Sequence, residues 1–206
     1  MAATDPQGTP ADSGRARVSV RALVLLTVVA LLVFALDQFA KYLVVSNMEV
    51  GELIPVLGEL FQLYFVKNSG AAFSLASGFT WILSIVAVGV IVVIIVFARR
   101  IKSVAWAVMF GLLLGGALGN VTDRLFREPG FGTGHVIDFL KVWGFPAIFN
   151  IADIAIVTGM GLFLLLTLRG VGLDGTRHVE HDASEADTPA ADAAAADDQS
   201  ERPAAS

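Results

Sequence analysis

The chain has 206 residues, 55% of them hydrophobic, with a formal net charge of −5 and no cysteine. Its mean hydropathy of +0.72 is too high for an ordinary soluble domain, and the apolar residues come in long runs, so we predict an integral membrane protein. The lack of cysteine excludes a disulfide and a thiol nucleophile. Only one histidine, His135, lies outside the tail, which excludes a histidine-rich metal site. We expect neither a metal nor a cofactor.

The two ends of the chain differ from its body. Residues 1–18 are polar and rich in Pro and Gly, which predicts a disordered arm. Residues 171–206 form a low-complexity Ala/Asp tail, also predicted to be disordered. Nine acidic and two basic side chains lie in 174–206, so the acidity belongs to the tail. The predicted folded domain is 19–170.

Four apolar segments in this domain are long enough to cross a bilayer, which takes about 20 helical residues. The predicted spans are 22–45, 81–97, 104–125 and 148–168. The first could instead be a cleaved signal peptide, but three further spans follow it. We therefore predict an all-α four-transmembrane-helix bundle.

Lys and Arg residues fix the predicted orientation, because they are enriched on the cytoplasmic side of membrane proteins. Three basic clusters fall on one side of a four-span protein: Arg15, Arg17 and Arg21; Arg99, Arg100 and Lys102; and Arg169. Both termini are then cytoplasmic, and the connections 46–80 and 126–147 face outward. The stretch LGELFQLYFVKNSG (57–70) predicts one or two strands, so we expect a small extracytoplasmic region that contains β-structure.

Polar residues inside the spans gather near their outer ends. Asp37 and Lys41 are spaced i, i+4 on the first span, which suits either a structural ion pair or a functional role. Lys41 could also extend to the outer lipid headgroups. On the third span Gly111, Gly115 and Gly119 share one face and predict close helix packing.

The third span ends in a polar group of Asn120, Asp123 and Arg124. Such a group serves either as a packing and hydrogen-bond anchor or as part of an active site. The spacing of these residues puts Asn120 within reach of both of the others along one helix face.

Two aspartates, Asp138 and Asp153, are fifteen residues apart, with Asn150 one turn before the second. If the chain brings them together, the pair shares a proton, and one carboxyl serves as a base while the other serves as an acid. That arrangement needs no Cys, His or metal. The alternative is structural: Asp138 caps a helix or pairs with Arg124, and Asp153 stabilises a helix N-terminus.

These residues lie in five motifs that resemble the lipoprotein signal peptidases (signal peptidase II), a family of bacterial membrane aspartic proteases. The motifs are DQFAK (37–41), NSGAAFS (68–74), GGALGNVTDR (115–124), GHVIDF (134–139) and FNIAD (149–153). They occur in the family's order over about 22–168. One departure is the stretch FREPGFGT (126–133), longer than the family pattern, which predicts a surface excursion before Asp138.

The resemblance implies an aspartic endopeptidase that cuts prolipoproteins before a diacylglyceryl-modified cysteine. It implies Asp138 and Asp153 as the catalytic pair. It implies supporting or substrate-binding roles for Asp37, Lys41, Asn68, Gly70, Asn120, Asp123, Arg124 and Asn150. The expected partners are the lipidated substrates and membrane lipids, without nucleic acid. A monomer in the bacterial plasma membrane is expected, with its active site toward the outer face.

Three other functions fit part of the pattern. A Ser/Lys protease would use Ser74 as nucleophile and Lys41 as base. A small ion or proton transporter would use Asp37, Asp123 and Asp153 as a relay, although these carboxylates cluster at one side of the membrane. A structural membrane protein would use none of them chemically.

Overall fold

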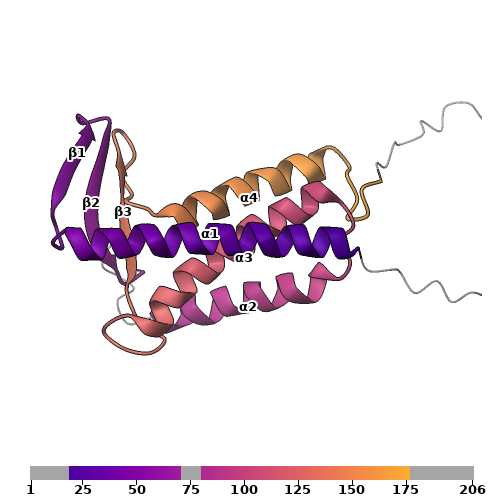
Figure 1. Ribbon diagram of the computed structural model, residues 1–206, viewed down its shortest axis with the longest axis horizontal. Coiled ribbons are helices and arrows are strands. Elements are labelled where there is room, and N and C mark those ends of the chain that lie inside the picture. The colour runs from indigo at the N-terminus through magenta and orange to yellow at the C-terminus, as the bar shows by residue number, and fades with distance from the viewer. Residues whose placement is uncertain (1–18, 71–79, 177–206) are drawn as a thin grey trace, which may run out of the picture.

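The computed structural model describes residues 19–70 and 80–176. The predicted disordered arm and most of the predicted acidic tail lie outside these residues, as does Ser74. The described chain forms helices and strands in the order α1, β1, β2, α2, α3, β3, α4. Figure 1 shows the strands at one end of the helical bundle and both ends of the described chain at the other.

All four predicted spans are helices: α1 (Val20–Asn47), α2 (Thr80–Ala98), α3 (Val104–Phe126) and α4 (Ile151–Leu168). Each helix is long and apolar enough to cross a membrane, which confirms the predicted fold class. The predicted start of α4 at position 148 is wrong. Phe149 instead forms a β-bridge with Leu140, and Asn150 caps the helix.

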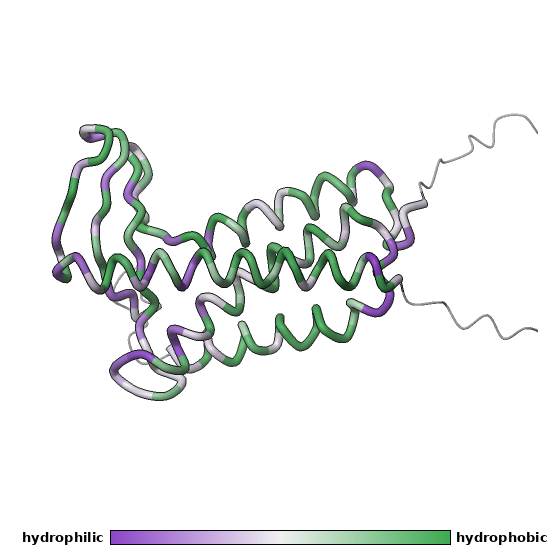
Figure 2. The backbone as a smooth tube through the Cα atoms, in the orientation of Figure 1, coloured by the Kyte–Doolittle hydropathy of each residue, from purple (hydrophilic) through white to green (hydrophobic). Residues whose placement is uncertain are grey.

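Helix α3 is the centre of the bundle, because it contacts α1, α2 and α4. In Figure 1, α1 passes in front of α3, with α4 and α2 on either side. Figure 2 shows apolar residues along the helices and hydrophilic residues near their ends. The bundle therefore presents an apolar belt of about the thickness of a membrane.

A three-stranded antiparallel sheet covers the other end of the bundle. Its strands are β1 (Leu53–Leu57), β2 (Phe61–Asn68) and β3 (Val136–Val142), with β2 in the middle. One strand, β2, lies within the stretch 57–70 where one or two were predicted, while β1 precedes that stretch and reaches it only at Leu57. Residues 126–147 are expected only as a connection, and within it Val136–Val142 form β3, because β2 supplies the pairing partners from a distant part of the chain.

A small apolar core fixes the sheet to the C-terminal end of α1. Val44 of α1, Phe65 of β2, and Ile137 and Phe139 of β3 are all buried together in it. Helix α1 has 28 residues, so at about 1.5 Å per residue it exceeds the hydrocarbon thickness and its last turns support the sheet. Strand β3, which carries Asp138, is thereby held against the helices.

The predicted glycine stripe on α3 is where α1 packs closest. A Cβ built on Gly115 would lie 2.6 Å from the main-chain oxygen of Ala30 and 2.7 Å from Cβ of Val33. A Cβ on Gly111 would lie 2.9 Å from the main-chain oxygen of Leu26. Because hydrogen atoms take the place of side chains, the backbones of α1 and α3 lie in contact.

The chain stays packed on the bundle beyond α4. The main-chain oxygen of Leu173 accepts from the backbone N–H groups of Lys102 and Ser103, at 3.0 and 3.1 Å. The indole Nε1 of Trp106 donates to the oxygen of Val171 at 3.0 Å. Residues up to 173 therefore satisfy groups at the start of α3, which extends the folded part past the predicted boundary at 170.

We expect Gly115→Ala to destabilise the protein, because the added methyl group meets the backbone of α1. Overpacking of this kind costs about 1–3 kcal/mol, more than the gain in helix propensity. The matched control is Gly161→Ala on α4, where a Cβ meets nothing within 4 Å. Thermal unfolding in detergent should show a lower midpoint for the first variant only. Equal midpoints for the two variants would contradict the close packing of α1 and α3.

Candidate active site

A buried lysine lies between two buried aspartates where α1 meets α3. Nζ of Lys41 is 2.8 Å from Oδ2 of Asp37 and 2.8 Å from Oδ2 of Asp123, and all three side chains have 0% exposure. The ion pair considered for Asp37 and Lys41 is therefore present, and Asp123 extends it. The predicted contact of Lys41 with lipid headgroups is wrong, because both carboxylates hold the ammonium inside the protein.

Each of these two aspartates also accepts a backbone N–H from a neighbouring element. Oδ1 of Asp37 accepts from the N–H of Ala152 at 2.9 Å, in the first turn of α4. Oδ2 of Asp123 accepts from the N–H of Ile137 at 3.2 Å, in β3. Ala152 directly precedes Asp153, and Ile137 directly precedes Asp138. The buried ion pairs thus fix the backbone beside both aspartates of the predicted pair.

Two further polar side chains complete this cluster, and neither is among the predicted site residues. Nε of Arg127 lies 2.6 Å from Oδ1 of Asp123. Nε2 of Gln38 donates to the main-chain oxygen of Gly119 at 3.1 Å and to Oδ2 of Asp37 at 3.2 Å. The i, i+4 spacing of Asp123 and Arg127, the rule used for Asp37 and Lys41, is the signal that could have found Arg127.

Asp138 lies in β3, paired with Val66 of β2, and its side chain is buried. Its two carboxyl oxygens accept from Nδ2 of Asn68 at 2.7 Å and from Nδ2 of Asn150 at 2.6 Å. The pKa of Asp138 is raised to about 6, mainly by burial and in smaller part by the charge of Asp153, against the lowering effect of the two amide donors and of Lys41. The carboxyl therefore titrates close to neutral pH.

Asp153 lies in the first turn of α4. The N–H of Asp153 donates to Oδ1 of Asn150 at 3.0 Å, and Oδ2 of Asp153 accepts the N–H of Asn150 at 3.1 Å, which makes a reciprocal capping box. Oδ1 of Asp153 accepts from Nδ2 of Asn120 at 2.8 Å. The helix N-terminus also stabilises negative charge at this position.

Asn150 connects the two carboxyls, because its side chain donates to Asp138 while its backbone donates to Asp153. The expectation that the chain brings Asp138 and Asp153 to one place therefore agrees with the geometry. The alternative that Asp138 caps a helix is wrong, since Asp138 lies inside β3. The alternative role of Asp153 as a helix N-terminal carboxylate is present, and it coexists with the pairing.

The remaining predicted site residues surround this pair. Asn68 donates to Asp138, and its Oδ1 accepts the N–H of Gly70 at 2.8 Å. Gly70 has a φ of +86°, which favours glycine. Arg124 donates from Nη1 to the main-chain oxygen of Asn120 at 3.3 Å. Among the described residues no ion pair joins Arg124 to Asp138, so that alternative pairing is wrong, although the charge of Asp138 acts on the guanidinium.

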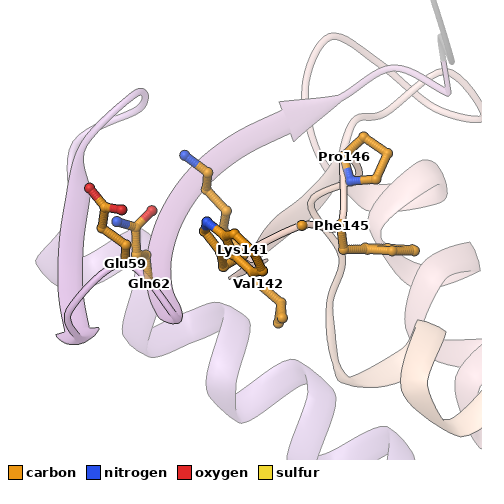
Figure 3. Close-up of a pocket in the computed structure, with 8 residues that line it drawn as sticks. Glu59, Gln62, Lys141, Val142, Phe145 and Pro146 are labelled. Carbon is orange, nitrogen blue, oxygen red and sulfur yellow. The ribbon is translucent and has the colours of Figure 1, made fainter.

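A cavity of about 590 Å³ opens beside the sheet, between the β1–β2 turn and the chain that follows β3 (Figure 3). It is lined by Glu59, Gln62, Lys141, Val142, Trp143, Gly144, Phe145 and Pro146. Neither Asp138 nor Asp153 lines this cavity. The carboxyl pair therefore belongs to the junction of β3 and α4, separate from the cavity.

This arrangement, with two carboxyls at the end of a four-helix bundle that carries the sheet, matches a known family along most of the chain. The family model described as Signal peptidase (SPase) II matches residues 29–169. The chain belongs to the signal peptidase II family. It is therefore a peptidase, and the resemblance seen in its five motifs is confirmed.

Individual relatives agree with the family model. The chain is 61% identical over 188 residues to a lipoprotein signal peptidase of Leifsonia xyli, covering 91% of this chain and 87% of the relative. It is 48% identical over 153 residues to one of Rhodococcus jostii, covering 74% and 77%. A solved bacterial membrane enzyme, determined by the in meso method at 2.3 Å, aligns with a TM-score of 0.64 and 26% identity over 80% of this chain and 98% of that one. The chain is a multi-pass bacterial membrane protein.

We expect Lys41→Ala to destabilise the protein by about 3–5 kcal/mol, because it leaves Asp37 without a counter-ion and Asp123 with Arg127 alone. The control is Lys67→Ala, which removes the ion pair of Lys67 with Glu128, where the side chains are 40% and 86% exposed. An exposed pair contributes about 1 kcal/mol or less. The check is chemical denaturation in detergent. A similar loss for both variants would mean that the buried cluster is not a main support of the fold.

Proposed function

We propose that this protein is an aspartic endopeptidase that removes signal peptides from diacylglyceryl-modified prolipoproteins, with Asp138 and Asp153 as its catalytic pair. Family membership supports the cleavage of lipoprotein signal peptides. The observation that carries the aspartic mechanism is the bridge made by Asn150, which donates to both carboxyls. Two carboxyls held by one residue are close enough to divide the roles of acid and base.

In the proposed reaction Asp153 is the base and Asp138 is the acid. Asp153, which accepts the backbone N–H of Asn150 at the N-terminus of α4, takes a proton from water. The resulting hydroxide attacks the scissile carbonyl carbon. Asp138, whose pKa burial already raises to about 6, holds a proton and donates a hydrogen bond to the developing oxyanion. A bound peptide that displaces water from Asp138 raises this pKa further.

Collapse of the tetrahedral intermediate completes the reaction. The carbon–nitrogen bond breaks, and the leaving amine takes the proton that the carboxyl pair received from water. No covalent bond between enzyme and substrate forms. Asn68, Asn120 and Asn150 hold the carboxyls through amide donors at 2.6–2.8 Å, and Arg124 and Gly70 are proposed to orient the substrate backbone.

The position of the pair suits a lipid-anchored substrate. Asp153 lies in the first turn of α4, at the end of the bundle that carries the sheet, so a peptide can reach it without leaving the bilayer surface. We propose that this end faces outward and that both termini are cytoplasmic, in line with the basic residues at the opposite end. The diacylglyceryl chains would then lie against the helices. One chain supplies every residue of the site, so a monomer suffices.

The alternatives have less support. A Ser/Lys mechanism needs a lysine free to accept a proton, but Nζ of Lys41 already donates to Asp37, Asp123 and Asn120. A transport relay needs carboxylates spread through the membrane depth. Asp37, Asp123 and Asp153 instead form one connected cluster at a single end of the bundle.

We expect Asp138→Asn and Asp153→Asn each to lower kcat at least 10³-fold, because each keeps the size of the side chain and removes its titrating group. The measurement is cleavage of a diacylglyceryl-modified prolipoprotein peptide by purified enzyme in detergent. The control Glu52→Gln neutralises a carboxylate at the exposed start of β1, and Ser74→Ala tests the rival nucleophile; both should keep turnover near wild type. Near-normal turnover of either aspartate variant would assign that residue to the scaffold.

The pH profile of kcat/KM distinguishes the acid from the base. If Asp138 must be protonated, kcat/KM falls as the pH rises through about 6, where this carboxyl loses its proton in the free enzyme. The fall approaches about tenfold per pH unit on the alkaline side. A peptide without titrating side chains keeps the substrate constant from pH 5 to 8.5. A kcat/KM that rises through the same pH would exchange the roles of the two aspartates.

A further inference from the structure

We propose that Lys41 is a positioning residue for the reaction and that it acts through Asn120. Its ammonium fixes the side-chain amide of Asn120 so that the NH₂ group, and not the oxygen, faces the catalytic base Asp153. This inference rests on the proposed role of Asp153. It gives the buried lysine a task in the chemistry besides its part in the fold.

The donors of Lys41 match the acceptors around it. An ammonium has three N–H bonds and no acceptor. Two of these bonds point at the carboxylates of Asp37 and Asp123, each with an N to O distance of 2.8 Å. The third points at Oδ1 of Asn120, 3.1 Å away. Because a lysine can only donate, the atom of Asn120 that faces it must be the amide oxygen.

A second donor selects the same orientation of the amide. Nδ2 of Asn150 also donates to Oδ1 of Asn120, at 3.1 Å. Asn150 is itself oriented, because its own oxygen accepts the backbone N–H of Asp153 at 3.0 Å. A turned Asn120 would place its NH₂ group against two donors and its oxygen against a carboxylate. Three contacts would become unfavourable at once.

The orientation of Asn120 in turn positions Asp153, the proposed base. With its oxygen held by Lys41, Asn120 directs Nδ2 at Oδ1 of Asp153, 2.8 Å away. This N–H fixes the direction of one carboxyl oxygen of Asp153, while the backbone N–H of Asn150 fixes the other. The orientation that water activation requires is then set before the substrate binds.

The test compares the effect of Asn120→Ala with and without the lysine. Lys41→Met alone would leave two buried carboxylates against one cation, so it is made together with Asp37→Asn, which keeps the net charge of the cluster. We expect Asn120→Ala to lower kcat about 100-fold in the wild-type chain and less than threefold in the Asp37→Asn/Lys41→Met chain. The same 100-fold loss in both chains would overturn the proposal, because Asn120 would then act without the lysine.

A second measurement does not depend on turnover. The side-chain NH₂ group of ¹⁵N-labelled Asn120, assigned by its loss in Asn120→Ala, should give an NMR signal that shifts on Asp153→Asn substitution. In the full-length Asp37→Asn/Lys41→Met chain, kept in detergent, we expect this signal to move toward the position of a free amide. An unchanged signal would overturn the proposal even if that variant were inactive.

A rescue separates positioning from folding. Lys41→Arg keeps a group that only donates, whereas Lys41→Gln introduces an amide that also accepts. We expect Lys41→Arg to keep a higher kcat than Lys41→Gln, with similar KM values for both. A lower kcat for Lys41→Arg at equal KM would contradict the proposal. Failure of the proposed catalytic pair is a different result, because Asp153→Asn would then keep its turnover. The NMR signal of Asn120 would still show whether Lys41 orients that amide.

Discussion

The burial of the Lys41 ammonium between Asp37 and Asp123 is the interaction on which the site depends. Removing three charges from water is costly, and the cost is offset only when each charge finds partners of good geometry. Here every N–H of the lysine has an acceptor, and Arg127 balances the second carboxylate. The cluster joins α1 to α3 at one defined register, because a shifted helix would leave a charge without its partner.

Asp37 and Asp123 also position the backbone beside the two proposed catalytic residues. They accept the backbone N–H groups of Ala152 and Ile137, which directly precede Asp153 and Asp138. A backbone donor cannot change rotamer, so these bonds fix the chain and not only a side chain. Glycine packing between α1 and α3 allows the approach, since a Cβ on Gly119 would lie 2.5 Å from Oδ2 of Asp37. The helix packing, the ion pairs and the geometry of the proposed catalytic pair are thus one connected arrangement.

The three asparagine side chains of the candidate site are also oriented by groups that can only donate. Asn68 is oriented by the N–H of Gly70, Asn120 by the ammonium of Lys41, and Asn150 by the N–H of Asp153. Each amide therefore directs its NH₂ group at one of the two carboxyls. In an environment with little water such fixed dipoles act strongly, and they need no rearrangement during the reaction.

Much of this protein followed from the sequence because the signals are local. Apolar length gave the four spans, the four-residue period gave the glycine stripe, and i, i+4 spacing gave the pair Asp37–Lys41. The motifs marked Asp138 and Asp153 as the candidates for catalysis. Only the tertiary structure decided the contacts between residues far apart in the chain. These are the pairing of β3 with β2, the ion pair of Lys41 with Asp123, and the hydrogen bonds of Asn150 to both aspartates. Those contacts depend on how helices and strands pack, and no spacing in the sequence encodes that packing.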